Sequence, residues 1–369
     1  MRVLAVSSSG RLGGAELALS EILRRWPAEA QVDALVVGDG PLVERLHEIG
    51  VQAWVAGAHR GRPSPRSIGA FTRSLLVLAR RLQPQVILAA GVKAAFLAAP
   101  GARLGGVPIV WQKVDLSLDS QLALPLAALV DGVVSVSAAA AASLGPLRER
   151  RLLDVVGTPV ALADKDYELA DERAPAIGTL GSLIPYKGHH HIVRAAALLV
   201  EEFPDLRVVL AGSPVDDYPH YPGELERLSA RLGVSRNVEI AGFVHDVVPL
   251  LGSLRVYVNA THRDEQGFGL EGLSGGMLEA AWVGLPVVAT RGGGNAEALL
   301  EGVSGTLVEP CDPEAIAAAA ARYLRDPVLA REAGEAGRRF VRERFSAEAV
   351  AGRVYRALQA VAKDGGHRG

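Results

Sequence analysis

The feature that most constrains this chain is a repeated alternation of short apolar runs with amphipathic stretches. The runs have the length of buried strands, and the stretches between them have helical periodicity. Strands and helices that alternate in this way form parallel sheets covered by helices on both faces. The first series of expected strands is Val3–Val6, Val32–Val37, Val51–Val55, Val86–Ala89, Val107–Trp111 and Gly132–Val136, with helices such as Glu16–Arg25, Leu42–Ile49 and Ile68–Leu82 between them.

The alternation weakens over Gly157–Pro175, where the charged run Asp164–Arg173 indicates a linker, and then starts again. The second series of expected strands is Ala176–Leu180, Arg207–Ala211, Val238–Gly242, Val256–Asn259, Pro286–Ala289 and Gly305–Val308. We therefore predict an α/β fold with two doubly wound, Rossmann-like parallel sheets, in domains of residues 1–165 and 166–346. Because such sheets bind ligands beyond the carboxyl ends of their strands, we expect the two domains to face each other across a binding cleft.

Composition excludes several classes of protein. The net charge of −2 argues against nucleic-acid binding, and the single cysteine, Cys311, excludes an internal disulfide and a cysteine-based metal cluster. No apolar run is long enough to cross a membrane. We expect a cytoplasmic protein. Residues 1–165 contain about 18 Lys and Arg against 13 Asp and Glu, so this basic half could contact an anionic acceptor or a membrane surface peripherally.

The most informative local segment is EGLSGGMLEAAWVGLPVVAT, residues 271–290. Glu271 and Glu279 stand eight residues apart, which corresponds to about 12 Å if the whole span is helical. That separation suits two ends of one extended ligand. Gly272, Leu273, Ser274 and the glycines that follow should leave backbone N–H groups open at a helix start, which favours phosphate binding. The segment therefore predicts a clamp for a sugar–diphosphate–nucleoside.

This segment resembles the E-x7-E motif of the retaining family 4 glycosyltransferases, which have the GT-B fold. The resemblance extends over nearly the whole chain. It implies that Glu279 binds the ribose hydroxyls and that Glu271 lies near the donor sugar. The nearby text Glu265–Gly269 is similar to the family's EGFG, but it lacks a carboxylate eight residues later. The resemblance also implies that the last helix, expected at Ala347–Ala362 within residues 347–369, crosses back to the N-terminal domain.

The stretch TLGSLIPYKGHHHIV is similar to the family's GRLxxxKG segment. Lys187 matches the lysine that contacts the donor diphosphate, where a fixed cation stabilises the leaving group. Ser182 stands where the family has an arginine. Arg11, Lys113 and Arg291 are candidates to supply the missing charge.

Three further segments match the family more loosely. Gly13 and Gly14 match a loop over the donor phosphates, although their spacing is not the dinucleotide fingerprint. Val244 lies in the region expected to contact the nucleobase through its backbone. In TRGGGNAEAL, Glu297 matches a common glutamate, and we weigh a structural role for the segment evenly against a catalytic one.

Histidines give little support for a metal or for an acceptor base. His189, His190 and His191 are consecutive in an expected helix, so they should point about 100° apart and should not share one ion. We predict no metal site. Val114 occupies the place of the family's acceptor-side histidine, which leaves Lys113 and Asp115 as weak acceptor candidates.

The resemblance implies a retaining transfer of a hexose-type sugar from a nucleotide-diphosphate donor, with UDP-sugars favoured, to a hydroxyl of a small molecule or glycan. Lys187 and Glu271 would be the catalytic residues, and neither a cofactor nor a metal would be required. One alternative is an enzyme that acts at a membrane surface on a lipid-linked or polysaccharide acceptor, because arginines flank Ile68–Leu82. Another is a sugar-nucleotide-binding protein without turnover.

Overall fold

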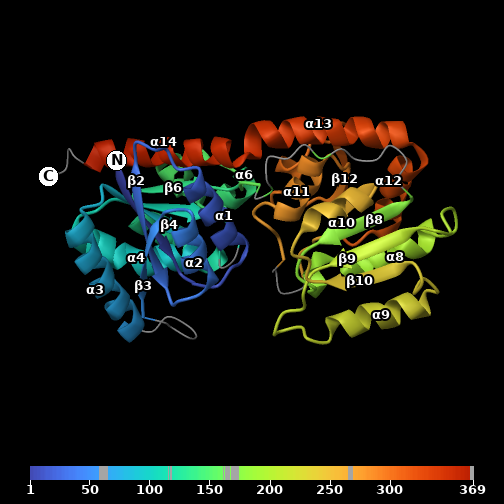
Figure 1. Cartoon of the computed structure of the whole chain (residues 1–369), viewed down its shortest axis with the longest axis horizontal. Helices are drawn as coiled ribbons and strands as arrows, with labels where there is room; N and C mark the ends of the chain where they lie inside the picture. Colours follow the sequence, from blue (N-terminus) through green and yellow to red (C-terminus); the bar gives the residue numbers. More distant parts are fainter. Residues whose placement is uncertain are drawn as a thin grey trace. The chain divides into compact units, whose positions relative to one another are not determined.

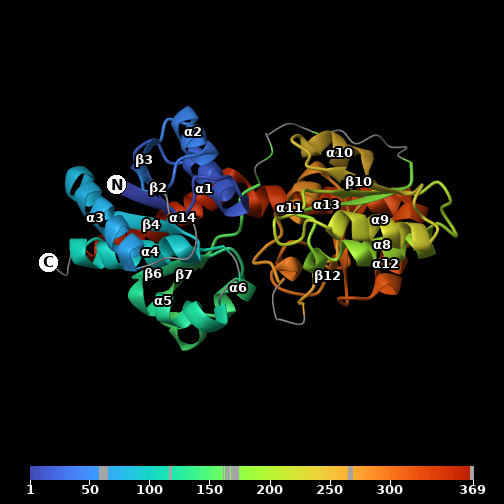
Figure 2. The same cartoon turned by 90° about the horizontal axis from the view of Figure 1, so that it is seen from below.

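The structure, a computed structural model, describes residues 1–57, 65–114, 116, 119–160, 162, 167, 174–264 and 269–365. The chain divides into two compact units (Figures 1 and 2). Unit 1 comprises Met1–Ala161 and Arg344–Gly369, and unit 2 comprises Leu162–Glu343. Each unit is an α/β domain built on one parallel sheet, as the strand and helix patterns predict.

Unit 1 contains a seven-stranded sheet in the order β3-β2-β1-β4-β5-β6-β7. The strands are β1 (Arg2–Ser7), β2 (Gln31–Val37), β3 (Gln52–Ala56), β4 (Val86–Ala90), β5 (Ile109–Lys113), β6 (Gly132–Ser135) and β7 (Leu152–Val155). The helices are α1 (Gly14–Arg24), α2 (Pro41–Glu48), α3 (Pro65–Leu82), α4 (Val92–Gly105), α5 (Leu124–Leu129), α6 (Ala138–Ala142), α7 (Arg148–Arg151) and α14 (Ala347–Gly365).

The two faces of the unit 1 sheet are covered by different helices. Alternate residues of β1 point to opposite faces, so Val3 packs in a core with α1, α2 and α14, whereas Leu4 packs in a core with α3 and α4. Helix α14, drawn in red in Figure 1, thus comes last in the sequence but completes a layer of unit 1. Arg353 anchors it to β7 through two contacts with Asp154, of 2.9 and 2.6 Å.

Unit 2 contains a six-stranded parallel sheet in the order β10-β9-β8-β11-β12-β13. Its strands are β8 (Ala176–Leu180), β9 (Arg207–Ala211), β10 (Val238–Gly242), β11 (Val256–Asn259), β12 (Val287–Thr290) and β13 (Gly305–Val308). Its helices are α8 (His189–Leu199), α9 (Tyr221–Arg231), α10 (Val247–Ser253), α11 (Gly275–Val283), α12 (Pro313–Arg325) and α13 (Pro327–Phe345). Helices α8, α9 and α12 share one core on this sheet.

The structure differs from the expected elements in a few places. Strand β7 is not expected from the sequence, because its pattern Leu-Leu-Asp-Val follows a short charged helix and is only partly buried. Strand β5 begins at Ile109 rather than Val107. Helix α3 buries most of one apolar side, including Phe71 and Leu75, inside unit 1, whereas Val77 is exposed. No described helix is long and apolar enough to cross a membrane.

Candidate functional site

The candidate site in unit 2 lies where the direction of strand connections reverses. Strands β8 and β11 are neighbours in the sheet, and the chain proceeds outward from them in opposite directions. Such a switch point leaves a crevice at the carboxyl ends of its strands, where α/β proteins bind ligands. Lys187 follows β8, and Asn259 is the last residue of β11. The site is therefore located by the topology as well as by the motifs.

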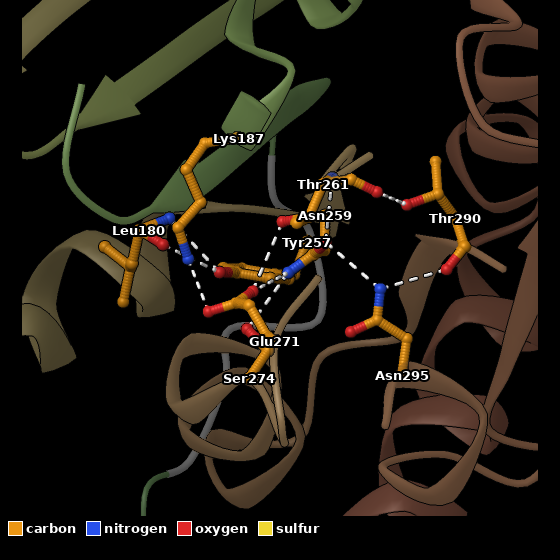
Figure 3. Close-up of polar contacts among 9 residues, drawn as sticks. All are labelled: Leu180, Lys187, Tyr257, Asn259, Thr261, Glu271, Ser274, Thr290 and Asn295. Carbon is orange, nitrogen blue, oxygen red and sulfur yellow. Dashed lines mark hydrogen bonds and ion pairs between the residues drawn. The ribbon is translucent and has the colours of Figure 1, made fainter. Parts of the chain in front are cut away.

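Lys187 and Glu271 form an ion pair, in which the Lys187 ammonium donates to Oε1 of Glu271 (Figure 3). Their side chains are 18% and 21% exposed, so the pair is reachable by a ligand. Burial alone would raise the pKa of Glu271. The charge and hydrogen bond of Lys187, with hydrogen bonds from Asn259 and Thr261, outweigh burial and lower that pKa. Glu271 is therefore ionised at neutral pH.

Buried polar side chains around the end of β11 hold the Glu271 carboxylate in place. Thr261 Oγ1 donates to Oε2 of Glu271 at 3.2 Å, and the amide of Asn259 approaches the same oxygen at 3.5 Å. The Asn259 amide also donates to Ser274 Oγ at 3.0 Å. Figure 3 shows Asn259 and Thr261 approaching the carboxylate, while Ser274 contacts Asn259. Because each polar group has a partner, the position of Glu271 is well defined.

The polar layer continues to the next strand. Thr290, at the end of β12, donates from Oγ1 to the backbone carbonyl of Thr261. The Asn295 amide donates to the carbonyl of Thr290 at 2.9 Å, and it lies 3.5 Å from Oδ1 of Asn259. All four side chains are buried. The carboxyl ends of β11 and β12 are thereby joined into one rigid floor.

Helix α11 begins later than the span Glu271–Glu279 predicts. Its first residue is Gly275, and Ser274 is the N-cap residue. The helix thus starts at the glycines, as expected, and the length of about 12 Å for a wholly helical span does not apply, because Glu271 lies in the loop before the helix. Ser274 accepts from Asn259 rather than capping the helix with its side chain. The N–H groups of the first turn thus have no side-chain cap, which is the condition for binding an anion.

Gly276 has a packing role in addition. A methyl group at this position would overlap the hydroxyl of Tyr257, whose ring is fully buried. That hydroxyl bridges both backbone groups of Leu180 at 3.2 Å (Figure 3). The absence of a side chain at Gly276 lets α11 approach the end of β8. Gly275, in contrast, has open space where a methyl group would be.

Glu279 lies on α11, one turn into the helix and partly buried. Burial raises its pKa to about 7. Within the described part of the chain, its carboxylate has neither a hydrogen bond nor an ion pair. A partly buried carboxylate without a partner is costly unless a ligand supplies donors. Glu279 is therefore suited to accept hydrogen bonds from hydroxyl groups.

The other predicted donor contacts of unit 2 lie around this site or at its edges. Gly272, Leu273 and Ser274 are buried in the loop that leads into α11. Ser182 is exposed just after β8, and Val244 is half-buried just after β10. Arg291, a candidate to replace the family's arginine, is engaged by Glu301 and by Glu309, the latter at 3.4 Å. Its charge is thus balanced by two carboxylates.

The glycine run after β12 fixes the backbone of Glu271. The Gly294 N–H donates to the Glu271 carbonyl at 3.0 Å. Gly293 has φ of +52°, and any side chain there would overlap the same carbonyl. This part of TRGGGNAEAL therefore has a structural role. Glu297 follows in a short helical turn.

In unit 1, Gly13 is the N-cap residue of α1, and Gly14 is its first residue. The Glu16 carboxylate accepts hydrogen bonds from the backbone of Gly13 and of Glu16 itself, while burial raises its pKa overall. A phosphate at this helix start would have to displace Glu16. Lys113 is only 1% exposed and lies over the Trp111 ring. Asp115, the other acceptor candidate, lies outside the described residues.

The histidine run behaves differently from the prediction. His189 packs edge-on against Tyr221, but the ring centroids of His190 and His191 are 4.0 Å apart. The expectation that consecutive histidines diverge is therefore wrong for this pair. His262, from the loop after β11, joins them at centroid distances of 5.6 and 5.1 Å. Burial, followed by neighbouring positive charge, lowers the pKa of His190 to about 3 and that of His191 to about 4.

Several residues of the site are absent from the sequence predictions. Asn259, Thr261, Thr290, Asn295 and Tyr257 were not expected to contribute. Three of them could be found from their position alone, because Asn259 and Thr290 end strands and Thr261 follows one closely. Asn295 and Tyr257 give no comparable signal. Their roles depend on contacts between segments far apart in the sequence.

The sequence of unit 2 is similar to a known protein family. Residues 163–340, nearly all of unit 2, match the family model described as Glycosyl transferases group 1. The chain is 34% identical over 200 residues to D-inositol 3-phosphate glycosyltransferase of Corynebacterium urealyticum, covering 52% of this chain and 45% of that protein. It is 33% identical over 174 residues to a GDP-mannose-dependent alpha-(1-6)-phosphatidylinositol monomannoside mannosyltransferase of Mycolicibacterium smegmatis, covering 47% of this chain and 44% of that protein. These matches thus span about half the length of each relative.

The fold has a counterpart along the whole chain. Anabaena Alr3699/HepE, solved in complex with UDP and glucose, superimposes with a TM-score of 0.80 at 20% sequence identity. The match covers 98% of this chain and 100% of that chain. At this identity the likeness establishes the fold. The chain therefore has the two-domain architecture of GT-B glycosyltransferases, as predicted.

Proposed function

We propose that this chain is a retaining glycosyltransferase of family 4, which moves a hexose-type sugar from a nucleotide-diphosphate donor to an acceptor hydroxyl. The observation that carries the proposal is the Lys187–Glu271 pair on its polar floor at the β8/β11 switch point. The family match of residues 163–340 supports the reaction class. The pair joins the two motifs that the resemblance assigns to the donor diphosphate and to the donor sugar.

In this proposal Lys187 supplies positive charge at the diphosphate. The bond between the anomeric carbon and the diphosphate oxygen breaks, and a bond to the acceptor oxygen forms on the same face of the sugar. The acceptor proton passes to an oxygen of the departing diphosphate. Lys187 and the uncapped first turn of α11 stabilise the developing negative charge, and no metal ion is needed for it.

Glu271 has two tasks in the same scheme. It orients the Lys187 ammonium, and its second oxygen, held by Thr261, faces the sugar hydroxyls. Glu279 then accepts hydrogen bonds from the ribose hydroxyls, for which its unpartnered carboxylate is suited. The loop of Gly272, Leu273 and Ser274 connects the two carboxylates and would run alongside the bound donor. Val244 and its neighbours after β10 would contact the base.

We favour a UDP-sugar, because the similar Anabaena protein was solved with UDP and glucose. The mannosyltransferase relative uses GDP-mannose, so guanine is the competing base. The direct test is isothermal titration of the protein with UDP-, GDP- and dTDP-sugars, followed by product analysis. We expect saturable binding of one donor, followed by transfer or hydrolysis of its sugar. Because the reaction is retaining, an α-linked donor should give an α-configured product. Binding without any turnover would reduce the protein to a sugar-nucleotide-binding role.

A lipid-linked or polysaccharide acceptor is the second candidate for the acceptor class. One relative is named for a phosphatidylinositol mannoside acceptor, and Arg73, Arg80 and Arg81 lie on the solvent side of α3 in unit 1. The apolar side of α3 is buried, so any membrane contact would be electrostatic rather than by insertion. Co-sedimentation with anionic vesicles at low salt tests this. No binding there would favour a small-molecule acceptor.

A further inference from the structure

A cluster of three imidazoles lies beside the proposed donor site and has no part in the proposed reaction. His190 and His191 come from the first turn of α8, and His262 comes from the loop after β11. One ring nitrogen from each lies within 4.8 Å of the other two. The fold of unit 2 thus brings together two segments that are about 70 positions apart in the sequence.

The ring nitrogens of this cluster are largely without partners. Both nitrogens of His191 and Nδ1 of His262 are inaccessible to solvent and have no hydrogen-bond partner among the described residues. Burying a polar atom without a partner is unfavourable, so these buried nitrogens need an explanation. A cation among the three neutral imidazoles would give one ring nitrogen of each histidine a partner.

We propose that His190, His191 and His262 bind a divalent transition-metal ion of the imidazole-preferring class, of which Zn²⁺ is the usual member. Zinc lies about 2.0–2.1 Å from histidine nitrogens, so its ligand atoms are about 3.4 Å apart. The observed limit of 4.8 Å requires the rings to close by little more than about 1 Å. Three ligands leave a fourth position for water or another oxygen.

A second contact supports the site. Nδ1 of His190 lies 3.0 Å from the Tyr221 hydroxyl. Histidine ligands of metals commonly donate their other ring N–H to an oxygen, which fixes the tautomer and aims the free nitrogen at the ion. Tyr221 is therefore a positioning residue of the cluster. Arg194 works against cation binding, because its exposed guanidinium places positive charge near His190 and His191.

The ion would act as a cross-link. His190 and His191 follow Lys187 closely, and His262 directly follows Thr261, which binds Glu271. The two segments are already joined by the His262 N–H donating to the Tyr186 carbonyl at 2.9 Å. A metal ion there would brace the two strand ends that carry the Lys187–Glu271 pair, without touching the donor itself.

The test uses the whole chain with any polyhistidine tag removed. After treatment with a chelator, the protein is titrated with ZnCl₂ in competition with a chromophoric chelator. We expect one zinc per chain and a rise in melting temperature on zinc addition. His191→Ala and His262→Ala should each weaken zinc binding by at least about tenfold and remove the thermal shift, and Tyr221→Phe should weaken it by about tenfold. Arg194→Ala should tighten it.

The matched control is His47→Ala, which removes an exposed histidine on α2 of unit 1. It should bind zinc as the unmodified chain does. Far-UV circular dichroism establishes that each variant is folded. In Co²⁺ titrations, the strong visible absorption of a tetrahedral site should appear in the unmodified chain and in His47→Ala but not in His262→Ala. Equal zinc affinity in all variants, or no zinc binding by the unmodified chain, would overturn the proposal whatever the enzymatic activity.

Discussion

The ammonium of Lys187 contacts the carboxylate of Glu271 across 84 positions of sequence, at the point where the strand connections of unit 2 diverge. Lysine and glutamate come from the loops that follow β8 and β11. Each residue is held by its own surroundings. Lys187 is the last residue of a 3-10 turn, and the buried polar side chains at the end of β11 support Glu271.

Replacement of Lys187 should affect turnover more than donor binding. In Lys187→Ala, the departing diphosphate loses a fixed cation, which we expect to lower kcat by about 10²- to 10³-fold. Steady-state kinetics with the preferred sugar nucleotide measures this, with donor affinity determined separately by titration. Lys363→Ala removes an exposed lysine of α14 and should leave kcat unchanged. Equal kcat in both variants would exclude Lys187 from the reaction.

Glu279 should make donor affinity depend on pH. Its pKa of about 7 means that it loses its charge as the pH falls through neutrality, and the protonated form is a poorer acceptor for two hydroxyls. Donor affinity should therefore fall by up to about tenfold between about pH 8 and about pH 6. In Glu279→Gln, affinity should be lower at high pH and flat over this interval. A pH profile shared by both proteins would assign the titration to another group.

The same carboxyl group has an effect of opposite sign on stability. Burial raises its pKa from the ordinary 4.5 to about 7, so the folded chain binds more protons than the unfolded chain between these two values. Stability should fall as pH rises from about 4.5 to about 7, by at most about 3 kcal/mol. Urea denaturation at several pH values should show this slope in the unmodified chain and a smaller slope in Glu279→Gln.

Two adjacent glycines should respond differently to the same substitution. Gly276→Ala forces a methyl group against the Tyr257 hydroxyl and should destabilise the protein by about 1–3 kcal/mol. Gly275→Ala has open space and should change stability by less than about 1 kcal/mol. Urea denaturation compares them. Adding Tyr257→Phe to Gly276→Ala should recover part of the loss, and no recovery would place the strain elsewhere.

Removal of the Asn259 side chain should lower both the free energy of unfolding and kcat. Asn259→Ala leaves Ser274 and the Thr261 N–H without a partner and weakens the support of Glu271, so we expect a loss of about 1–3 kcal/mol together with reduced kcat. Asn237→Ala is the matched control. Its amide donates to the carbonyls of Pro204 and Leu206, away from the site. It should destabilise to a similar degree while kcat of the folded enzyme stays the same.

All strands of the two sheets except β7 could be predicted from sequence, because parallel strands are buried on both faces and appear as continuous apolar runs. Five of the six expected strands of unit 2 have the predicted bounds, and the sixth, Val287–Thr290, is shifted by one residue. Lys187 and Glu271 could be predicted as well, since each stands in a motif of local sequence. The structure also joins them in an ion pair, a contact that the motifs by themselves do not specify.

The remainder of the site depends on long-range contacts, which leave no local pattern. Asn259 and Thr290 are polar residues at strand ends, and their partners become evident only when β11 and β12 are adjacent. The histidine cluster shows the same difficulty more sharply. Consecutive helical positions give no reason to expect convergence, and His262 joins them from 71 residues or more downstream through the loop after β11.

The return of α14 to unit 1 has a consequence for the order of assembly. Val350, Val354 and Leu358 complete the apolar layer that β1, α1 and α2 begin some three hundred positions earlier. During synthesis, unit 2 has all its strands available before that layer can close. Unit 1 meanwhile keeps an uncovered apolar surface, so its maturation waits until α14 has left the ribosome.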